Sequence, residues 1–221
     1  MTKLLHIDTA TDTGTVAIGI DGVVAAYRTN EEARNHASVI NNMINDLLAD
    51  AEISMEELSA IAVCAGPGSY TGLRIGMATA KGLCYALDKP LILADRLSLL
   101  AYRAYRQQKN AAQYVSLLTA RDKEYFISVY DNNFVCTVQP QHIMENQLGS
   151  LVEKIENSYL ITDAPTGVND SLNIINLSID NDTKTELSSW AFFAFEQYKC
   201  NKIVNLSVAE PFYLKQVYTH K

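Results

Sequence analysis

The chain has 221 residues, of which 48% are hydrophobic and 19% are charged, a composition typical of a globular protein and unlike that of a disordered one. With 18 basic and 25 acidic residues the formal net charge is −7, so the sequence lacks the basic character of a nucleic-acid platform. The apolar start of the chain stops at Asp8, which indicates a strand rather than a signal peptide, and no stretch is apolar enough to span a membrane. We therefore expect a cytoplasmic protein with no membrane partner. The four cysteines form no CxxC pair, which favours buried free thiols over a zinc or redox site.

The first hundred residues predict strands and helices in a regular order. Strands are expected at 3–8, 15–20 and 23–28, and the tight turns between them predict an antiparallel meander. Apolar residues at helical spacing predict a helix over 36–51, and the S-x-x-E pattern at Ser54 predicts a short capped turn. The remaining elements are a buried strand (58–65) with an apolar run over 60–65, a long helix (70–87), a strand (90–94) and a helix (96–108).

The same order starts again after residues 109–113. The expected elements are strands at 114–119, 124–130 and 134–138, a weak helix at 145–155, a strand at 158–162 and a helix at 186–198. This duplicated βββαβα unit is the organisation of the actin-like superfamily, which includes sugar kinases and the Hsp70 ATPase. We therefore predict an α/β fold with two such lobes. The N-terminal lobe is expected to span residues 1–109, joined by the C-terminal segment 207–221, and the smaller lobe residues 110–206.

The segment Gly66–Gly72 joins the apolar strand to the long helix, where backbone N–H groups can hold a phosphate. Its G-x-G-x-x-x-G spacing is one residue too long for a dinucleotide fingerprint, and it contains neither a P-loop lysine nor a G-x-S-x-G elbow. The alternative is a tight turn with Ser69 or Thr71 as the helix N-cap, and spacing alone favours this alternative.

The helix after this segment has almost no polar face, because its only charges are Arg74 and Lys81. We expect such a helix to be covered on two sides, by its own sheet and by a second helix. Gly72 and Gly76 would allow that helix to approach closely, although each glycine costs a helix about 0.5–1 kcal/mol relative to alanine. The residues alone favour equally a helix of a partner subunit and an internal one, such as 36–51.

Several motifs resemble the bacterial TsaB (YeaZ) family. They are Asp8–Thr11 (DTAT), Ala65–Gly76 (AGPGSYTGLRIG), Ala78–Leu83 (ATAKGL) and, near the C-terminus, Glu210–Lys215 (EPFYLK). The resemblance is strong over residues 1–97 and thin over 115–200. The family's D-A-R-R-G-E-V-Y segment departs from its pattern here, since residues 119–125 read TARDKEY and lack the first Asp and the Gly.

The resemblance implies an actin-like fold and a place in tRNA threonylcarbamoyladenosine biosynthesis. It implies a non-catalytic partner that binds and activates a related TsaD-type transferase subunit as a heterodimer, with a TsaE-type ATPase joining the complex. A homodimer is possible in isolation, and tRNA is reached only through the complex. Family members pair through helices of the N-terminal lobe, so the expected interface residues are Gly72, Arg74, Ile75, Gly76, Thr79, Lys81, Leu83, Asn42, Asn45 and Asp46.

Two enzymatic alternatives stand beside this hypothesis. An active actin-like ATPase or small-molecule kinase would use Asp8 and Thr9 at the first nucleotide turn, but it needs a second glycine-rich turn in the other lobe. Eight of the ten glycines lie at or before Gly82, so that second turn is missing from the sequence. A peptidase of the glycoprotease type would need a catalytic constellation, and no HExxH motif or pair of histidines four residues apart is present. We therefore expect no catalytic residue, no cofactor and no metal.

Overall fold

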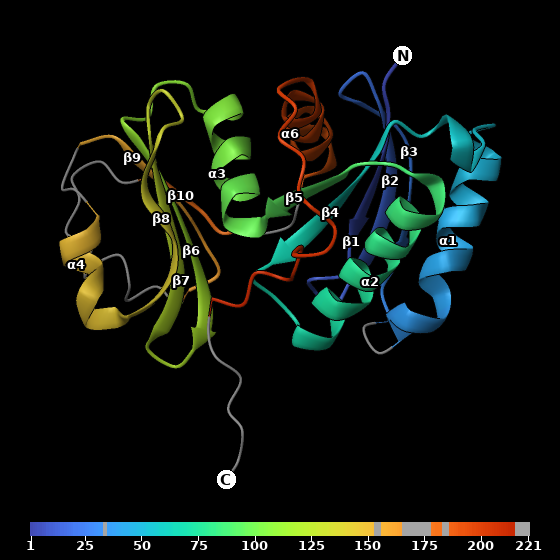
Figure 1. Ribbon diagram of the computed structural model, residues 1–221. Coiled ribbons are helices and arrows are strands. Elements are labelled where there is room, and N and C mark those ends of the chain that lie inside the picture. The colour runs from blue at the N-terminus through green and yellow to red at the C-terminus, as the bar shows by residue number, and fades with distance from the viewer. Residues whose placement is uncertain (33–34, 153–155, 165–177, 183–185, 215–221) are drawn as a thin grey trace, which may run out of the picture. The chain divides into compact units, whose positions relative to one another are not determined.

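The computed structural model contains two compact units (Figure 1). The residues that it describes are 1–32, 35–152, 156–164, 178–182 and 186–214. Unit 1 consists of the described residues of Met1–Arg96 and Leu187–Phe212, and unit 2 of those of Leu97–Glu186 together with Tyr213 and Leu214. These boundaries differ from the expected lobes, because residues 97–109 belong to unit 2 and residues 187–206 to unit 1. Residues 207–212 do return to unit 1, where the Phe212 N–H donates to the carbonyl oxygen of Ala65 at 2.7 Å.

Five strands form the sheet of unit 1 in the order β3-β2-β1-β4-β5. Their bounds are β1 (Lys3–Asp8), β2 (Gly14–Ile20), β3 (Val23–Asn30), β4 (Ala60–Gly66) and β5 (Leu91–Asp95). The first three strands pair antiparallel, which confirms the predicted meander, and β1, β4 and β5 run parallel. Every residue of β4 is buried, as expected of a strand covered on both faces.

Helices cover both faces of this sheet. They are α1 (His36–Asp50), α2 (Tyr70–Leu87) and α6 (Leu187–Lys199). α1 and α2 lie side by side on one face (Figure 1), where Ile40 and Met77 share a core with Leu5 of β1. The next residue on β1, His6, points to the opposite face, because side chains alternate along a strand. Its ring meets Trp190 of α6 edge-on, with the ring centres 5.0 Å apart, so α6 covers that second face.

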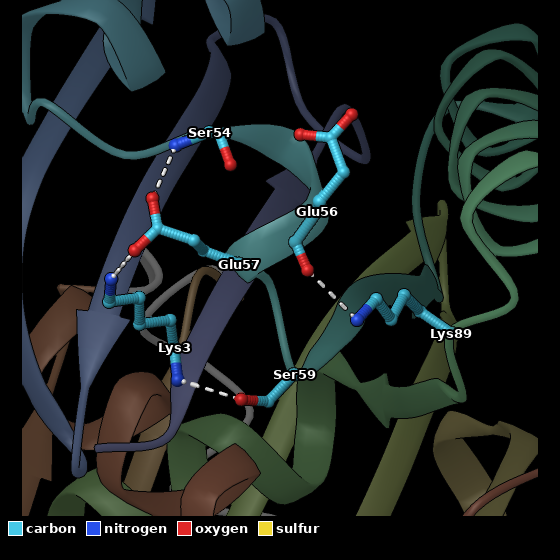
Figure 2. Close-up of polar contacts among 6 residues, drawn as sticks. All are labelled: Lys3, Ser54, Glu56, Glu57, Ser59 and Lys89. Atoms are coloured by element: carbon cyan, nitrogen blue, oxygen red, sulfur yellow. Dashed lines mark hydrogen bonds and ion pairs between the residues drawn. The ribbon is translucent and has the colours of Figure 1, made fainter.

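The short 3-10 turn η2 (Met55–Glu57) is fastened to its neighbours by polar contacts, which Figure 2 shows. One carboxylate oxygen of Glu57 lies 2.5 Å from Nζ of Lys3, and the other accepts the backbone N–H of Ser54 at 2.9 Å. The bond to Ser54 is one half of the predicted capping box. The hydrogen bond from Lys3 lowers the pKa of Glu57 below its usual value. Nζ of Lys89 donates to the carbonyl oxygen of Glu56 at 3.0 Å.

Among the described residues, the sheet of unit 2 also has five strands, in the order β10-β9-β6-β7-β8. Their bounds are β6 (Gln113–Arg121), β7 (Glu124–Asp131), β8 (Cys136–Met144), β9 (Ser158–Thr162) and β10 (Ser178–Asp180). β6, β7 and β8 pair antiparallel, while β6, β9 and β10 run parallel. Because β6 to β10 take the places of β1 to β5, the two sheets share one strand order. This confirms that the structural unit is duplicated.

The helical elements of unit 2 pack on opposite faces of its sheet. In the part of unit 2 that the structure describes, they are α3 (Arg96–Gln107), the 3-10 turn η3 (Glu145–Gln147) and α4 (Leu148–Leu151). Leu148 packs with Val115 and Ile127, whereas α3 packs with Tyr114 and Tyr130. The helix expected over 145–155 is therefore only one turn of α4 after a 3-10 turn, and residues 153–155 lie outside the described residues.

Two further expectations need correction. The strand expected at 134–138 begins at Cys136, because Oδ1 of Asp131 accepts the N–H groups of Asn133 and Val135 and so extends the turn before it. The expectation of buried cysteines is wrong for Cys200, which is exposed just after α6. No helix among the described residues is long and apolar enough to cross a membrane.

Candidate partner-binding face and nucleotide turn

The turn after β1 contains Asp8 and Thr9, the two residues predicted as candidates for nucleotide binding. Asp8 is only 4% exposed, and its Oδ1 accepts the backbone N–H of Ala10 at 2.9 Å. Oγ1 of Thr9 donates to the carbonyl oxygen of Gly72 at 2.6 Å. The Asp8 side chain therefore holds the turn in place, and the Thr9 side chain joins the turn to α2.

The start of α2 is closed by the same turn. The carbonyl oxygen of Ala10 accepts the N–H of Ser69 at 2.8 Å, and the Ser69 carbonyl accepts the N–H of Leu73 at 2.8 Å. Oγ of Ser69 accepts the N–H of Gly72 at 3.2 Å, so Ser69 is the N-cap that the sequence offered as one alternative. Two of the N–H groups that a phosphate would require at this helix start, those of Ser69 and Gly72, thus have partners within the chain.

Close approach of the turn to α2 explains three glycines. A Cβ at Gly68 would lie 2.2 Å from the carbonyl oxygen of Ala10, and one at Gly72 would lie 1.9 Å from the carbonyl oxygen of Thr9. A Cβ at Gly76 would lie 2.4 Å from Oγ1 of Thr9. The expectation that Gly72 and Gly76 open α2 to a partner helix is therefore wrong. Both are buried and face the turn after β1, so their missing side chains permit an internal contact.

The surface of α2 that faces away from the sheet lies elsewhere on the helix. We call its exposed residues the α2 outer face; they are Tyr70, Thr71, Arg74, Ala78, Gly82, Tyr85 and Ala86. A Cβ at Gly82 would meet no atom of the described chain within 4 Å. Tyr85, one turn further along, is 86% exposed. The sequence prediction did not select Ala78, Gly82 or Tyr85 for the interface, although their helical spacing from Arg74 places them on one stripe.

The other residues expected at the interface on α2 are divided between surface and interior. Arg74 is exposed, and its guanidinium carbon lies 4.3 Å from the ring centre of Tyr70. Thr79 is partly exposed. Ile75 and Leu83 are partly buried against the core of unit 1. Nζ of Lys81 donates to the carbonyl oxygen of Ala209 at 2.9 Å, so this side chain joins α2 to the C-terminal segment and contributes an internal contact.

On α1, the three expected interface residues are all exposed: Asn42, Asn45 and Asp46. Because α1 and α2 lie side by side on the sheet (Figure 1), these residues and the α2 outer face belong to one helical surface of unit 1. Arg74, Thr79, Gly82 and Tyr85 of α2 and the three α1 residues are thus at least partly exposed on two neighbouring helices.

Comparisons with known proteins find similarity to proteins named for tRNA modification. A family model described as "TsaD: tRNA N6-adenosine threonylcarbamoyltransferase" matches residues 29–220. The "tRNA threonylcarbamoyladenosine biosynthesis protein TsaB" of Escherichia coli is 34% identical over 131 residues, which cover 59% of this chain and 56% of that protein. A tRNA N6-adenosine threonylcarbamoyltransferase of Novosphingobium aromaticivorans is 49% identical over 65 residues, covering 29% of this chain and 19% of that protein. The chain spans about half the length of the first curated relatives that it matches.

Similarity to solved structures extends over nearly the whole chain. YeaZ from Pseudomonas aeruginosa superposes with a TM-score of 0.80 at 24% identity, covering 97% of this chain and 100% of that one. At this identity the likeness shows the fold. Together with the shared strand order of the two sheets, it confirms the predicted α/β architecture of two actin-like lobes.

Proposed function

The chain belongs to the TsaB (YeaZ) family, and we propose that it is a non-catalytic subunit in tRNA threonylcarbamoyladenosine biosynthesis. In this proposal it binds and activates a TsaD-type transferase subunit through the helical surface of α1 and α2. A TsaE-type ATPase joins the complex in the cytoplasm, and tRNA is bound mainly by the partners, since this chain carries a net charge of −7. In isolation, the same surface would support a homodimer.

Gly82 is the observation that carries the proposal. A glycine inside a helix costs about 0.5–1 kcal/mol relative to alanine. At Gly72 and Gly76 the contact with Thr9 offsets that cost, whereas Gly82 meets no atom of the described chain. Ala78, one turn earlier, is also small and exposed. A helix of another subunit would be able to approach the α2 backbone closely at this point.

The residues on either side of Gly82 have the chemistry of an interface. Aromatic residues and arginine are enriched among the residues that dominate binding energies. Tyr85 is 86% exposed, Tyr70 is 39% exposed, and Arg74 lies over the ring of Tyr70. Two aromatic side chains and one guanidinium therefore flank a backbone that a partner helix is able to approach closely.

The nucleotide turn supports a non-catalytic role. Asp8 caps its own turn. At the start of α2, the carbonyl oxygen of Ala10 accepts the N–H of Ser69, and Oγ of Ser69 accepts the N–H of Gly72. The matching turn of unit 2, after β6, is a hairpin at Arg121–Lys123 that contains no glycine. An actin-like ATPase or kinase holds its nucleotide with a turn from each lobe. The rival kinase hypothesis, which uses Asp8, therefore has less support than the partner hypothesis.

Reconstitution tests the proposal. The purified chain is mixed with a TsaD-type transferase subunit, a TsaE-type ATPase and tRNA, and the modified nucleoside is quantified with and without the chain. We expect modification to depend on the chain, and the chain alone to hydrolyse no ATP. Full modification without the chain would overturn the proposal. Sustained ATP hydrolysis by the chain alone, abolished by Asp8→Asn, would instead support the kinase hypothesis.

A further inference from the structure

We propose that unit 2 carries a binding site for a nucleoside monophosphate, at the place where α3 ends and β9 and β10 begin. An open cavity of about 570 Å³ lies there. It is lined by residues 106–111 after α3, by Asn157, Ser158 and Tyr159, and by Ser178. Its volume lies within the range of about 300–1,000 Å³ that is typical of small-molecule sites. The proposal concerns a different surface from the α2 outer face and does not depend on the partner hypothesis.

The charge of the cavity favours an anion. Residues 96–121 contain five basic residues and no acidic one, although the whole chain carries a net charge of −7. Two of the five, Arg106 and Lys109, line the cavity, and none of its lining residues in the described part of the chain is acidic. The nearby carboxylate of Asp180 already contacts Arg103, at 2.7 Å. A guanidinium together with an ammonium is the combination that binds phosphate by charge-assisted hydrogen bonds.

The uncharged lining residues favour a nucleoside attached to that phosphate. Four of them carry side-chain amides: Gln107, Gln108, Asn110 and Asn157. Each amide offers both a donor and an acceptor, which suits ribose hydroxyls and the polar edge of a base. Tyr159 adds an aromatic ring, on which a base is able to stack. A simple inorganic anion would use the cations of this cavity and leave the amides and the ring without a role.

The wall of the cavity is held in place before any ligand binds. The carbonyl oxygen of Gln108 accepts the hydroxyl of Tyr114 at 2.7 Å, and the N–H of Ala112 donates to the carbonyl oxygen of Asn157 at 2.9 Å. Ser158 is 1% exposed, and its Oγ accepts a hydrogen bond from Nε2 of Gln113 at 2.8 Å. Because these bonds join the end of α3 to the start of β9, the ligand would meet a preformed site.

The test measures binding by the full chain alone, without magnesium. The probes are AMP, adenosine and a short single-stranded RNA, each titrated by calorimetry into the wild type and into Arg106→Ala/Lys109→Ala. The control is Arg121→Ala/Lys123→Ala, which removes the same two charge types from an exposed hairpin of the same unit. All four substituted side chains are exposed, so both double variants are expected to fold, and circular dichroism checks this.

We expect the wild type and the hairpin control to bind AMP equally, and the cavity variant to bind it about tenfold more weakly. Adenosine should bind more weakly than AMP. If the wild type binds the RNA more tightly than AMP, the site's ligand is a nucleotide within an RNA chain. If it binds the RNA as tightly as AMP or more weakly, the ligand is a free nucleotide. The proposal is overturned if AMP and RNA both fail to bind, if the cavity variant binds like the wild type, or if adenosine binds as tightly as AMP.

Discussion

Units 1 and 2 have the same strand order, but the turn after the first strand differs between them. In unit 1, the turn after β1 presses against α2, and a Cβ at Gly72 would clash with Thr9. In unit 2, the turn after β6 is a hairpin without glycine, in which Lys123 adopts a φ of +56°. The comparison shows that the duplicated strand order fixes where the strands lie. The contacts of the turns between the strands determine what each unit can bind.

The two sheets also differ on one face, which is the face away from α1 in unit 1 and the face away from α4 in unit 2. β1 places His6 there, paired with Ala17 and in contact with Trp190. On the corresponding face of unit 2, the matching strand β6 carries Ser116, paired with Ser128, and both serines are fully buried. Unit 1 therefore has a buried group that titrates within an accessible pH range, where unit 2 has two hydroxyls that do not.

The largest effect is expected from Gly72→Ala, which tests the contact of the first turn in unit 1. The added Cβ would lie 1.9 Å from the carbonyl oxygen of Thr9, so the backbone of α2 or of the turn after β1 must move. We expect the free energy of unfolding to fall by about 3 kcal/mol or more. The matched control is Gly82→Ala in the same helix, which should raise stability by up to about 1 kcal/mol. Denaturant unfolding measures both, and equal effects of the two substitutions would contradict the internal role of Gly72.

A smaller effect is expected from acidification, acting through His6. Burial lowers the pKa of His6 to about 4, from an ordinary value of 6.5. Between these two pH values the unfolded chain binds a proton that the folded chain does not, so stability falls as the pH falls. The contribution is complete above pH 6.5, and about 3 kcal/mol of it is lost by pH 4. We expect His6→Leu to flatten this part of the pH profile, measured by denaturant unfolding.

If the wild type and His6→Leu lose stability in parallel over this range, the neutral buried state of His6 is refuted. Hydrogen exchange adds the comparison of the units. Protection should decrease on acidification around β1 and α6 of unit 1 before it decreases around β6 of unit 2, which carries the uncharged Ser116 on the corresponding face.

A third prediction concerns unit 2 and its buried cation. Arg103 is 4% exposed, and its Nη2 lies 2.7 Å from a carboxylate oxygen of Asp180, so Arg103→Leu would leave that carboxylate without its partner. Asp180 is partly exposed, and we therefore expect a loss of about 2 kcal/mol, less than for a fully buried pair. Hydrogen exchange should show the loss in α3 and β10. Arg106→Leu, at an exposed position of α3, is the control, and an equal loss there would contradict the role of the ion pair.

Most elements could be predicted from the sequence because their signals are local. Turn residues and alternating apolar residues located β1 to β3, and Ser69 marked the start of α2. The orientation of Gly72 and Gly76 could not be predicted, because their neighbour Thr9 lies more than sixty residues earlier in the chain. The same applies to Lys81, whose partner Ala209 lies far along the chain.

The boundaries of the two units were beyond local signals as well. α3 follows β5 of unit 1 but belongs almost wholly to unit 2, and α6 follows β10 of unit 2 but belongs to unit 1. In each half of the chain, the last helix thus belongs to the unit that is formed mainly by the other half. An apolar stripe shows that a helix is covered, and it does not show which sheet covers it.

The most direct test of the central claim measures the affinity between this chain and a TsaD-type transferase subunit. Calorimetry compares the wild type with Gly82→Leu, and with Gly149→Leu as a control at an exposed glycine of α4 in unit 2. The account predicts that Gly82→Leu stays folded and binds about a hundredfold more weakly, because its side chain blocks the approach of the partner helix, while Gly149→Leu binds like the wild type. A folded Gly82→Leu variant with wild-type affinity would contradict the assignment of the α2 outer face as the binding surface.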